Sequence, residues 1–140
     1  MNYITFYQSQ AFKQYLFSIS GRIVGGNQLG RTIDMPTANL EPIEDCSDIA
    51  CGVYAVMIRL EDEMHQGITH IGPRPSVDDS FGITIETYIF DFEGDIYDKE
   101  VTVFGFLFIR DTKKFDTIQQ LKAQVDKDIS VAIDYLNNLY

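Results

Sequence analysis

β-branched and aromatic residues gather in short runs along the chain as far as about residue 110, and glycine, proline or acidic residues separate these runs. Residues of these types pack well on a pleated surface, so each run predicts a β-strand. The clearest runs are residues 17–24, 53–60, 64–71, 83–90 and 101–109. Between them, residues 61–63 predict the tip of a hairpin, and residues 92–95 predict a turn. The pattern therefore indicates a largely antiparallel sheet.

The period of the hydrophobic residues changes after Asp116. Apolar residues now recur every three or four positions, which is the stripe of an amphipathic helix. The members of the stripe are Ile118, Leu121, Val125, Ile129, Ile133, Leu136 and Leu139. Thr117 and Gln120 have the spacing of a capping box at its start. Because closure removes the exposed edges of a sheet, we predict a small closed or partly open β-barrel covered by this helix.

Composition places the chain among ordinary globular proteins. Its 140 residues include 45% hydrophobic and 23% charged residues, which suits one domain with one core. No run of about 18 apolar residues would span a bilayer, and residues 1–10 lack the basic start and apolar core of a signal peptide. We therefore expect a cytoplasmic protein. The two cysteines, Cys46 and Cys51, are interpreted as free thiols without a role.

The net charge and its distribution indicate which partners the chain can bind. The formal net charge of -10 repels polyphosphate backbones, so we expect neither nucleic acid nor an anionic membrane as a partner. Residues 18–31, however, contain two arginines and no acid, and they end in a glycine-rich loop that leads to Arg31. Glycines let backbone amides approach an anion closely, so this segment is a candidate phosphate loop. Taken alone, it also fits a plain hairpin loop.

A second candidate follows at Pro36, Thr37, Ala38 and Asn39. The proline fixes the backbone, and the two short polar side chains alternate toward one side. Hydroxyl and amide oxygens suit a hard cation such as Mg²⁺, which takes few protein ligands beside the phosphates of a substrate. The alternative interpretation is a turn held by local bonds between side chain and backbone.

The third candidate is Glu86, a lone acid in an otherwise apolar and β-branched strand. Strict alternation predicts that it shares a face with Thr84 and Tyr88. A carboxylate in a partly desolvated site can take a proton from a hydroxyl during phosphoryl transfer. The alternative is that Glu86 lies on the solvent face of an edge strand.

These candidates occur in an order that resembles the riboflavin kinase family. The resemblance runs from about Ser18 to the end of the chain. It is carried by residues 30–40, 52–56 and 71–76, by the strand around Glu86, by residues 108–116 and by the helical residues 121–125. The resemblance implies a mainly β fold, a six-stranded antiparallel Greek-key β-barrel with a C-terminal α-helix. It also implies an N-terminal extension at residues 1–17 and a barrel domain at residues 18–140.

The implied activity is transfer of the γ-phosphate of ATP to the terminal ribityl hydroxyl of riboflavin, which gives FMN and ADP. By the same resemblance, Thr37 and Asn39 match the residues that hold the metal ion and phosphate oxygens. Mg²⁺ is the expected ion, with Zn²⁺ or Mn²⁺ as alternatives. Glu86 matches the general base for the ribityl hydroxyl.

The resemblance also assigns the two ends of the site. Gly26 and Arg31 match the phosphate-loop positions of the family, and Ile89, Asp91 and Tyr97 fall where the adenine pocket is lined.

On the flavin side, Arg110, Lys113 and Phe115 match the loop that faces the ring. A cation near the ring and an aromatic against its face suit an electron-poor heterocycle. The alternative for these three residues is a helix-entry loop with solvated cations.

Some features depart from the family pattern. Met35, His70, Ser76 and Tyr88 stand where other residues are common, but none of them removes the expected metal ligands or the base. Bacterial relatives often carry an adenylyltransferase domain that makes FAD, whereas only 17 residues precede the matching part here. We therefore expect a monomer that acts on small molecules and does not make FAD, or a domain of a longer protein that includes the adenylyltransferase domain.

Two other functions stay open from the sequence alone. The altered residues also fit a module of the same fold that binds flavin or nucleotide without turnover. Small barrels host many functions, so an adaptor for protein interactions is a further alternative.

Overall fold

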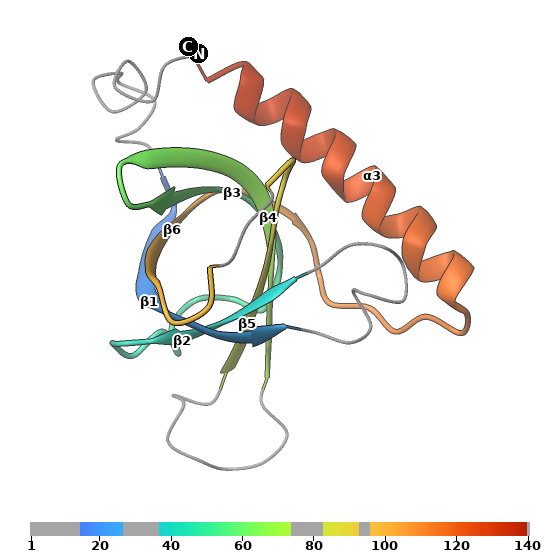
Figure 1. The fold of residues 1–140 in the computed structure, drawn as a ribbon. Coiled ribbons are helices and arrows are strands. Elements are labelled where there is room, and N and C mark those ends of the chain that lie inside the picture. The colour runs from blue at the N-terminus through green and yellow to red at the C-terminus, as the bar shows by residue number, and fades with distance from the viewer. Residues whose placement is uncertain (1–14, 27–36, 74–82, 93–95, 140) are drawn as a thin grey trace.

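Six strands close into a barrel, and one long helix lies along its outside (Figure 1). This computed structural model describes residues 15–26, 37–73, 83–92 and 96–139. The strands are β1 (Phe17–Gly26), β2 (Ala38–Pro42), β3 (Gly52–Leu60), β4 (Glu63–Pro73), β5 (Ile83–Ile89) and β6 (Glu100–Arg110), and the helix is α3 (Ile118–Asn137). Each of the five strand-like runs of the sequence forms a strand, whereas β2 was not predicted from its pattern.

The strand order around the barrel is β1-β2-β5-β4-β3-β6, and every pairing between neighbours is antiparallel. Strands β3, β4 and β5 follow one another as a meander, and β6 returns to lie beside β3. This arrangement of four strands is a Greek key. The predicted mainly β, six-stranded Greek-key barrel with a C-terminal helix is therefore confirmed. The predicted hairpin tip is also confirmed, because Leu60 pairs with Glu63 across it, whereas the turn predicted at 92–95 lies mostly outside the described residues.

Alternating side chains of all six strands fill the barrel. The interior is almost entirely aliphatic; its members include Ile19, Ile23, Leu40, Val56, Ile58, Ile71, Ile85 and Val103. One polar pair lies among them, because the hydroxyl groups of Thr69 and Thr87 face each other across β4 and β5 at 2.8 Å. Each hydroxyl satisfies the other, so the pair is tolerated in the core.

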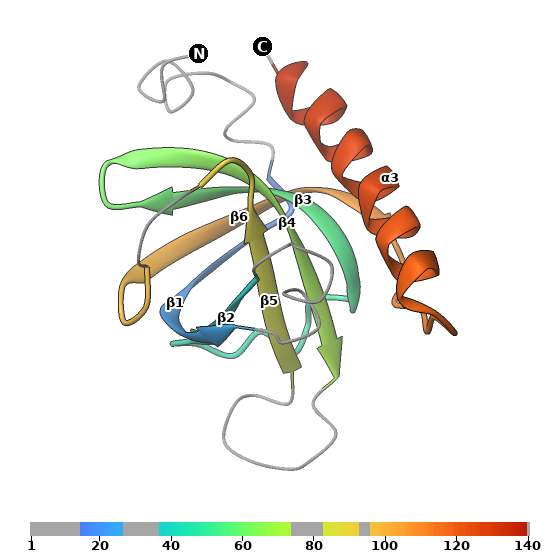
Figure 2. The ribbon, with the colours of Figure 1, turned by 45° about the vertical axis from the view of Figure 1, so that its right-hand side comes forward.

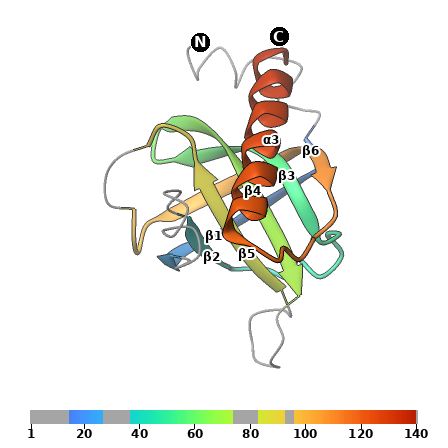
Figure 3. The same ribbon diagram turned by 90° about the vertical axis from the view of Figure 1, so that its right-hand side faces the viewer.

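The helix α3 packs on the outer faces of β3, β4 and β6, as Figure 2 and Figure 3 show. This contact makes a second core outside the barrel, with Ala132 and Leu136 fully buried. The Thr117 hydroxyl caps the helix by accepting the N–H of Gln120 at 3.1 Å. The reciprocal bond of the predicted capping box is shifted, since the Gln120 side chain accepts the N–H of Asp116.

Gly67 tests how closely the strands of the barrel approach one another. It is buried in β4, where an added Cβ would overlap the Tyr88 carbonyl oxygen and lie 2.8 Å from Cδ1 of Ile58. We predict that Gly67→Ala lowers the free energy of unfolding by about 2 kcal/mol, because a backbone atom cannot move aside as a side chain can. Urea denaturation measures this change.

The matched control is Gly25→Ala, because nothing lies within 4 Å of a Cβ added there. Its free energy of unfolding should change by less than about 0.5 kcal/mol. Equal effects of the two substitutions would contradict the prediction.

Candidate active site between the barrel and the helix

A row of register partners crosses the outside of the barrel near one end. Asn39 on β2 pairs with Glu86 on β5, Glu86 with His70 on β4, His70 with Val53 on β3, and Val53 with Arg110 on β6. Side chains of such partners lie on the same face, with Cβ atoms roughly 5 Å apart. Five strands thus bring a carboxylate, an imidazole, an amide and a guanidinium into one line.

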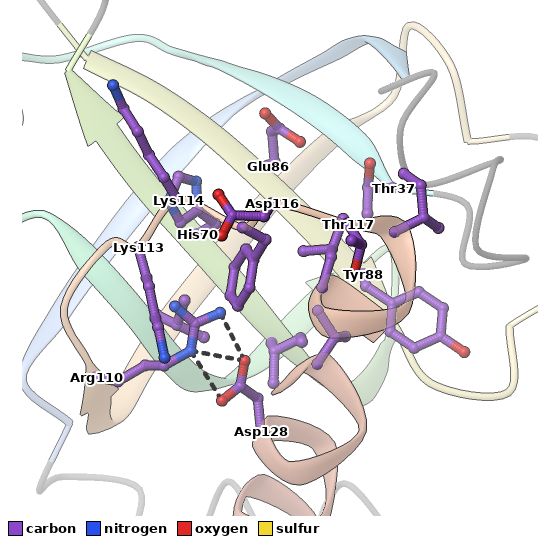
Figure 4. A pocket seen from close by; sticks show the side chains of 16 residues that line it. Thr37, His70, Glu86, Tyr88, Arg110, Lys113, Lys114, Asp116, Thr117 and Asp128 are labelled. Carbon is purple, nitrogen blue, oxygen red and sulfur yellow. Dashed lines mark hydrogen bonds and ion pairs between the residues drawn. The ribbon is translucent and has the colours of Figure 1, made fainter. Parts of the chain in front are cut away.

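Four members of this row, Glu86, His70, Val53 and Arg110, form one wall of a cavity of about 610 Å³ (Figure 4). Asn39 is not among the residues that line it. The polar lining from the barrel side comes from Thr37, His70, Glu86, Tyr88 and Arg110. The facing wall comes from residues 113–117 and from Leu121 and Val125 of α3. A largely apolar cavity of this size with a few converging polar groups suits a small organic ligand.

Glu86 lies in the middle of the sheet and not on an edge. β5 pairs with β4 on one side and with β2 on the other, so the edge-strand interpretation is wrong. Alternation holds along β5, because Ile85 and Thr87 are buried in the barrel while Glu86 is half-buried on the outside. The strand therefore presents the Glu86 carboxylate to the cavity.

Thr37 and Asn39 lie where β2 begins. Ala38 and Asn39 pair with both β1 and β5, so this part of the motif is a strand and not the turn of the alternative interpretation. The Thr37 hydroxyl oxygen is buried and has no hydrogen-bond partner among the described residues. An unsatisfied buried oxygen costs free energy unless a ligand completes it.

These oxygens fit a hard cation such as Mg²⁺. Within the described ranges, no group of three or more His, Cys, Asp or Glu residues could hold a metal ion. The groups that would hold a cation here are the Thr37 hydroxyl and the Asn39 amide oxygen, together with oxygens of a bound phosphate.

His70 lies between Glu86 and Arg110 and was noted in the sequence only as a departure. Burial lowers the pKa of His70 below its ordinary value; the Glu86 carboxylate opposes this shift and Arg110 adds to it. The imidazole is therefore neutral near pH 7. It lies over Gly72, because a Cβ added to Gly72 would be 3.0 Å from Cε1 of the ring.

The end of β6 supplies the cationic side of the site. The guanidinium carbon of Arg110 lies 5.7 Å from the centre of the Phe115 ring, and Nζ of Lys113 lies 5.6 Å from it. Arg110 is not a solvated cation, since its side chain is 18% exposed and pairs with Asp128 of α3. The sequence did not single out Asp128, although an acid on the apolar face of the helix was a usable signal.

The structure does not bring the other predicted residues into the cavity. Ile89 is 7% exposed and packs inside the barrel, and Tyr97 is 48% exposed. Asp91 is exposed with a positive φ of 53°, and Gly26 ends β1 opposite Ala38. Their assignments to the nucleotide side stay predictions. Arg31, Met35 and Ser76 lie outside the described residues.

The two cysteines are free thiols, as expected. Burial, with the nearby acids Glu44, Asp45 and Asp48, raises the pKa of Cys46 to about 11. The thiolate that a nucleophile or metal ligand needs is therefore scarce at neutral pH.

The fold is a closed Greek-key barrel with a helix against its outer face. A cavity that contains a carboxylate lies between the two, which is the arrangement of a barrel enzyme that acts on a small molecule. The family model described as "Flavokinase: Riboflavin kinase" matches residues 13–136. The chain belongs to the riboflavin kinase family.

The chain is similar to a curated protein whose name includes riboflavin kinase and to a solved structure with another title. The bifunctional riboflavin kinase/FMN adenylyltransferase of Listeria monocytogenes is 38% identical over 114 residues, which are 81% of this chain and 36% of that protein. The crystal structure of a macrolide-efflux protein from Streptococcus pneumoniae is 36% identical with a TM-score of 0.74, and the match covers 82% of this chain and 38% of that one. The chain thus spans well under half the length of these relatives.

A likeness in fold alone comes from the riboflavin kinase of Trypanosoma brucei, with 22% identity and a TM-score of 0.62 over 86% of this chain and 80% of that one.

Among the described residues, no helix combines the length and the apolar character needed to cross a bilayer.

The neutral state of His70 predicts a pH dependence of stability. The unfolded chain protonates this histidine with a pKa near about 6.5, whereas the folded protein resists protonation, so the unfolded state binds more protons as the pH falls. The free energy of unfolding therefore falls as the pH is lowered through about 6.5 and on through the lower pKa of the folded state.

His70→Asn removes this proton uptake. Between about pH 7 and about pH 5, the Tm of the unchanged protein should fall more steeply than the Tm of the variant, as measured by scanning calorimetry. Parallel curves for the two proteins would show that His70 is not buried in its neutral form.

Proposed function

We propose that this protein transfers the γ-phosphoryl group of ATP to the terminal ribityl hydroxyl of riboflavin, giving FMN and ADP. The observation that carries the proposal is the lining of the cavity. One wall presents the Glu86 carboxylate and the buried, unbonded Thr37 hydroxyl, and the other presents Phe115 and apolar residues of α3. Membership of the riboflavin kinase family supports the same reaction.

The chemistry assigned to Glu86 is that of a general base. The ribityl oxygen forms a bond to the γ-phosphorus as its proton passes to the Glu86 carboxylate. The bond between the γ-phosphorus and the bridging oxygen breaks, and its electron pair leaves with ADP. Positioning and charge neutralisation dominate such transfers, so the walls that orient the substrates matter as much as the base.

Thr37 and Asn39 are the residues that would hold Mg²⁺, or Zn²⁺ or Mn²⁺ in its place, together with phosphate oxygens. When bound, the ion neutralises charge on the phosphates of ATP. Lys113 and Lys114 line the same cavity, together with the acids Glu86 and Asp116. Phe115 offers an aromatic face for the ring of riboflavin.

The wider setting of the protein is part of the proposal. The chain acts on small molecules, works in the cytoplasm as a monomer, and has an adenylyltransferase domain linked to it if the natural protein is longer. The bifunctional relative from Listeria monocytogenes supports the linked domain. Size-exclusion chromatography with light scattering tests the monomer.

Glu86→Gln tests the base. Removing the proton acceptor while keeping the shape of the side chain should lower the rate of FMN formation by roughly 10² to 10⁴, with little change in substrate binding. The assay incubates protein with riboflavin, ATP and MgCl₂ and separates the flavins by chromatography.

Glu41→Gln is the control, since Glu41 lies exposed on β2 away from the cavity lining. Undiminished turnover in the Glu86 variant would remove Glu86 from the mechanism. Riboflavin that binds to the unchanged protein without forming FMN would favour a binding module instead.

Thr37→Val tests the metal and phosphate site. The hydroxyl has no partner among the described residues in the ligand-free protein, so its loss should not lower the free energy of unfolding. Affinity for ADP with Mg²⁺ should fall roughly tenfold, because a ligand oxygen is lost. Calorimetric titration measures the affinity and thermal unfolding measures the stability.

Thr84→Val is the matched control. Thr84 lies on the same face of β5 as Glu86. Its hydroxyl donates to the Gly72 carbonyl at 3.3 Å, so this variant should lose about 1 kcal/mol of stability and keep its nucleotide affinity. A loss of stability without a loss of affinity in the Thr37 variant would return Thr37 to a structural role.

A further inference from the structure

Asp128 is a buried acid in the wall of the cavity. It lies on α3, is 1% exposed, and both of its carboxylate oxygens have partners. Nε of Arg110 donates to Oδ1 and Oδ2 at 3.0 Å each, and Nη2 of Arg110 lies 2.9 Å from Oδ2. Nε2 of Gln124 donates to Oδ1 at 3.0 Å. The carboxylate is thus fully paired in a place where an unpaired charge would be costly.

The pair fixes the direction of the Arg110 side chain. The carboxylate holds one edge of the guanidinium through both Nε and Nη2, which fixes its plane in a way that a lysine could not reproduce. Figure 4 shows the pair at one side of the cavity, where the helix faces β6. Without Asp128, Arg110 would be free to leave this place on the wall.

Further contacts lead from Arg110 into the cavity wall. Its Nη1 donates to the Asp111 carbonyl at 3.1 Å, and its guanidinium lies over the Phe115 ring. Nζ of Lys113 lies 5.6 Å from the centre of the same ring. Asp128 therefore contacts Arg110, Arg110 contacts the Phe115 ring, and this ring lines the cavity.

Segment 111–117 has few other anchors. Among the described residues, its remaining hydrogen bonds run to the first turn of α3, at Gln120 and Leu121. On the barrel side, the contact of Phe115 is with the Arg110 guanidinium, which lies over its ring. The position of Phe115 therefore depends on where Arg110 is held.

We propose that Asp128 is a positioning residue, which holds Arg110 and through it the Phe115 ring in the place that binds the ring of riboflavin. This inference rests on the proposed function. It assigns Asp128 no contact with substrate, so its loss should change the affinity for riboflavin more than the chemical step.

The first test compares Asp128→Asn with Asp126→Asn, the same substitution at an exposed position of the same helix. Quenching of flavin fluorescence measures the Kd for riboflavin, calorimetry measures the Kd for ADP with Mg²⁺, and the FMN assay measures kcat. In Asp128→Asn, the Kd and KM for riboflavin should rise about tenfold or more, while kcat stays within about threefold. The nucleotide Kd should not change, and Asp126→Asn should behave as the unchanged protein.

A second comparison separates positioning from stability and serves if Asp128→Asn fails to fold. Arg110→Met should raise the riboflavin Kd and lower the Tm, because it leaves the carboxylate buried and unpaired. Adding Asp128→Leu in that background should restore the Tm and leave the riboflavin Kd raised, since Asp128 acts only through Arg110. Recovery of riboflavin affinity together with Tm would show a merely structural role and overturn the proposal.

The outcomes also separate the two proposals. FMN formation by the unchanged protein, together with an unaltered riboflavin Kd in Asp128→Asn, overturns the inference alone. No FMN from the unchanged protein, with riboflavin still bound and weakened in Asp128→Asn, overturns the proposed function and supports the inference. A protein that binds no riboflavin overturns both.

Discussion

The pairing of β2 with β5 is the constraint on which the barrel and the site both depend. In the described part of the chain it consists of two register pairs, Ala38 with Thr87 and Asn39 with Glu86. The first pair points into the barrel, and the second points out toward the site. A slip of one residue would exchange these faces, so the register that closes the barrel also sets Asn39 beside Glu86.

The second layer of the structure supplies what a barrel alone lacks. β3 is buried on both faces along most of its length, because its outer side packs under α3. The helix therefore cannot leave without exposing apolar surface, and residues of its first half line the cavity. The cavity therefore has one wall on strands and another on a helix and its entry segment, and a site held on strands and helices is positioned more precisely than a site on loops.

The parts that could be predicted from the sequence are those with a local signal. Five strands and the helix show in the hydrophobic period, and Glu86 stands out as an acid in an apolar strand. β2 has no such signal, since it has five residues and ends at Pro42, and only the resemblance implied a sixth strand. The helical pattern places Asp128 on the apolar face, but its pairing with Arg110, 18 residues away, appears only in the fold. Ile89 was named from the resemblance, which does not say toward which face a side chain points. In the structure its side chain packs inside the barrel.

Three groups that ordinary folding would avoid lie around the same cavity: the unbonded Thr37 hydroxyl, the half-buried neutral His70 and the buried pair of Asp128 with Arg110. The buried hydroxyls of Thr69 and Thr87, in contrast, satisfy each other inside the barrel. The other unbonded side-chain atom among the described residues, Nε2 of His65, still lies 3.3 Å from a Glu63 oxygen. Such unfavourable groups persist where the surrounding fold holds them, and they are concentrated at functional sites. Their presence around this cavity identifies it as the candidate functional site independently of any likeness to other proteins.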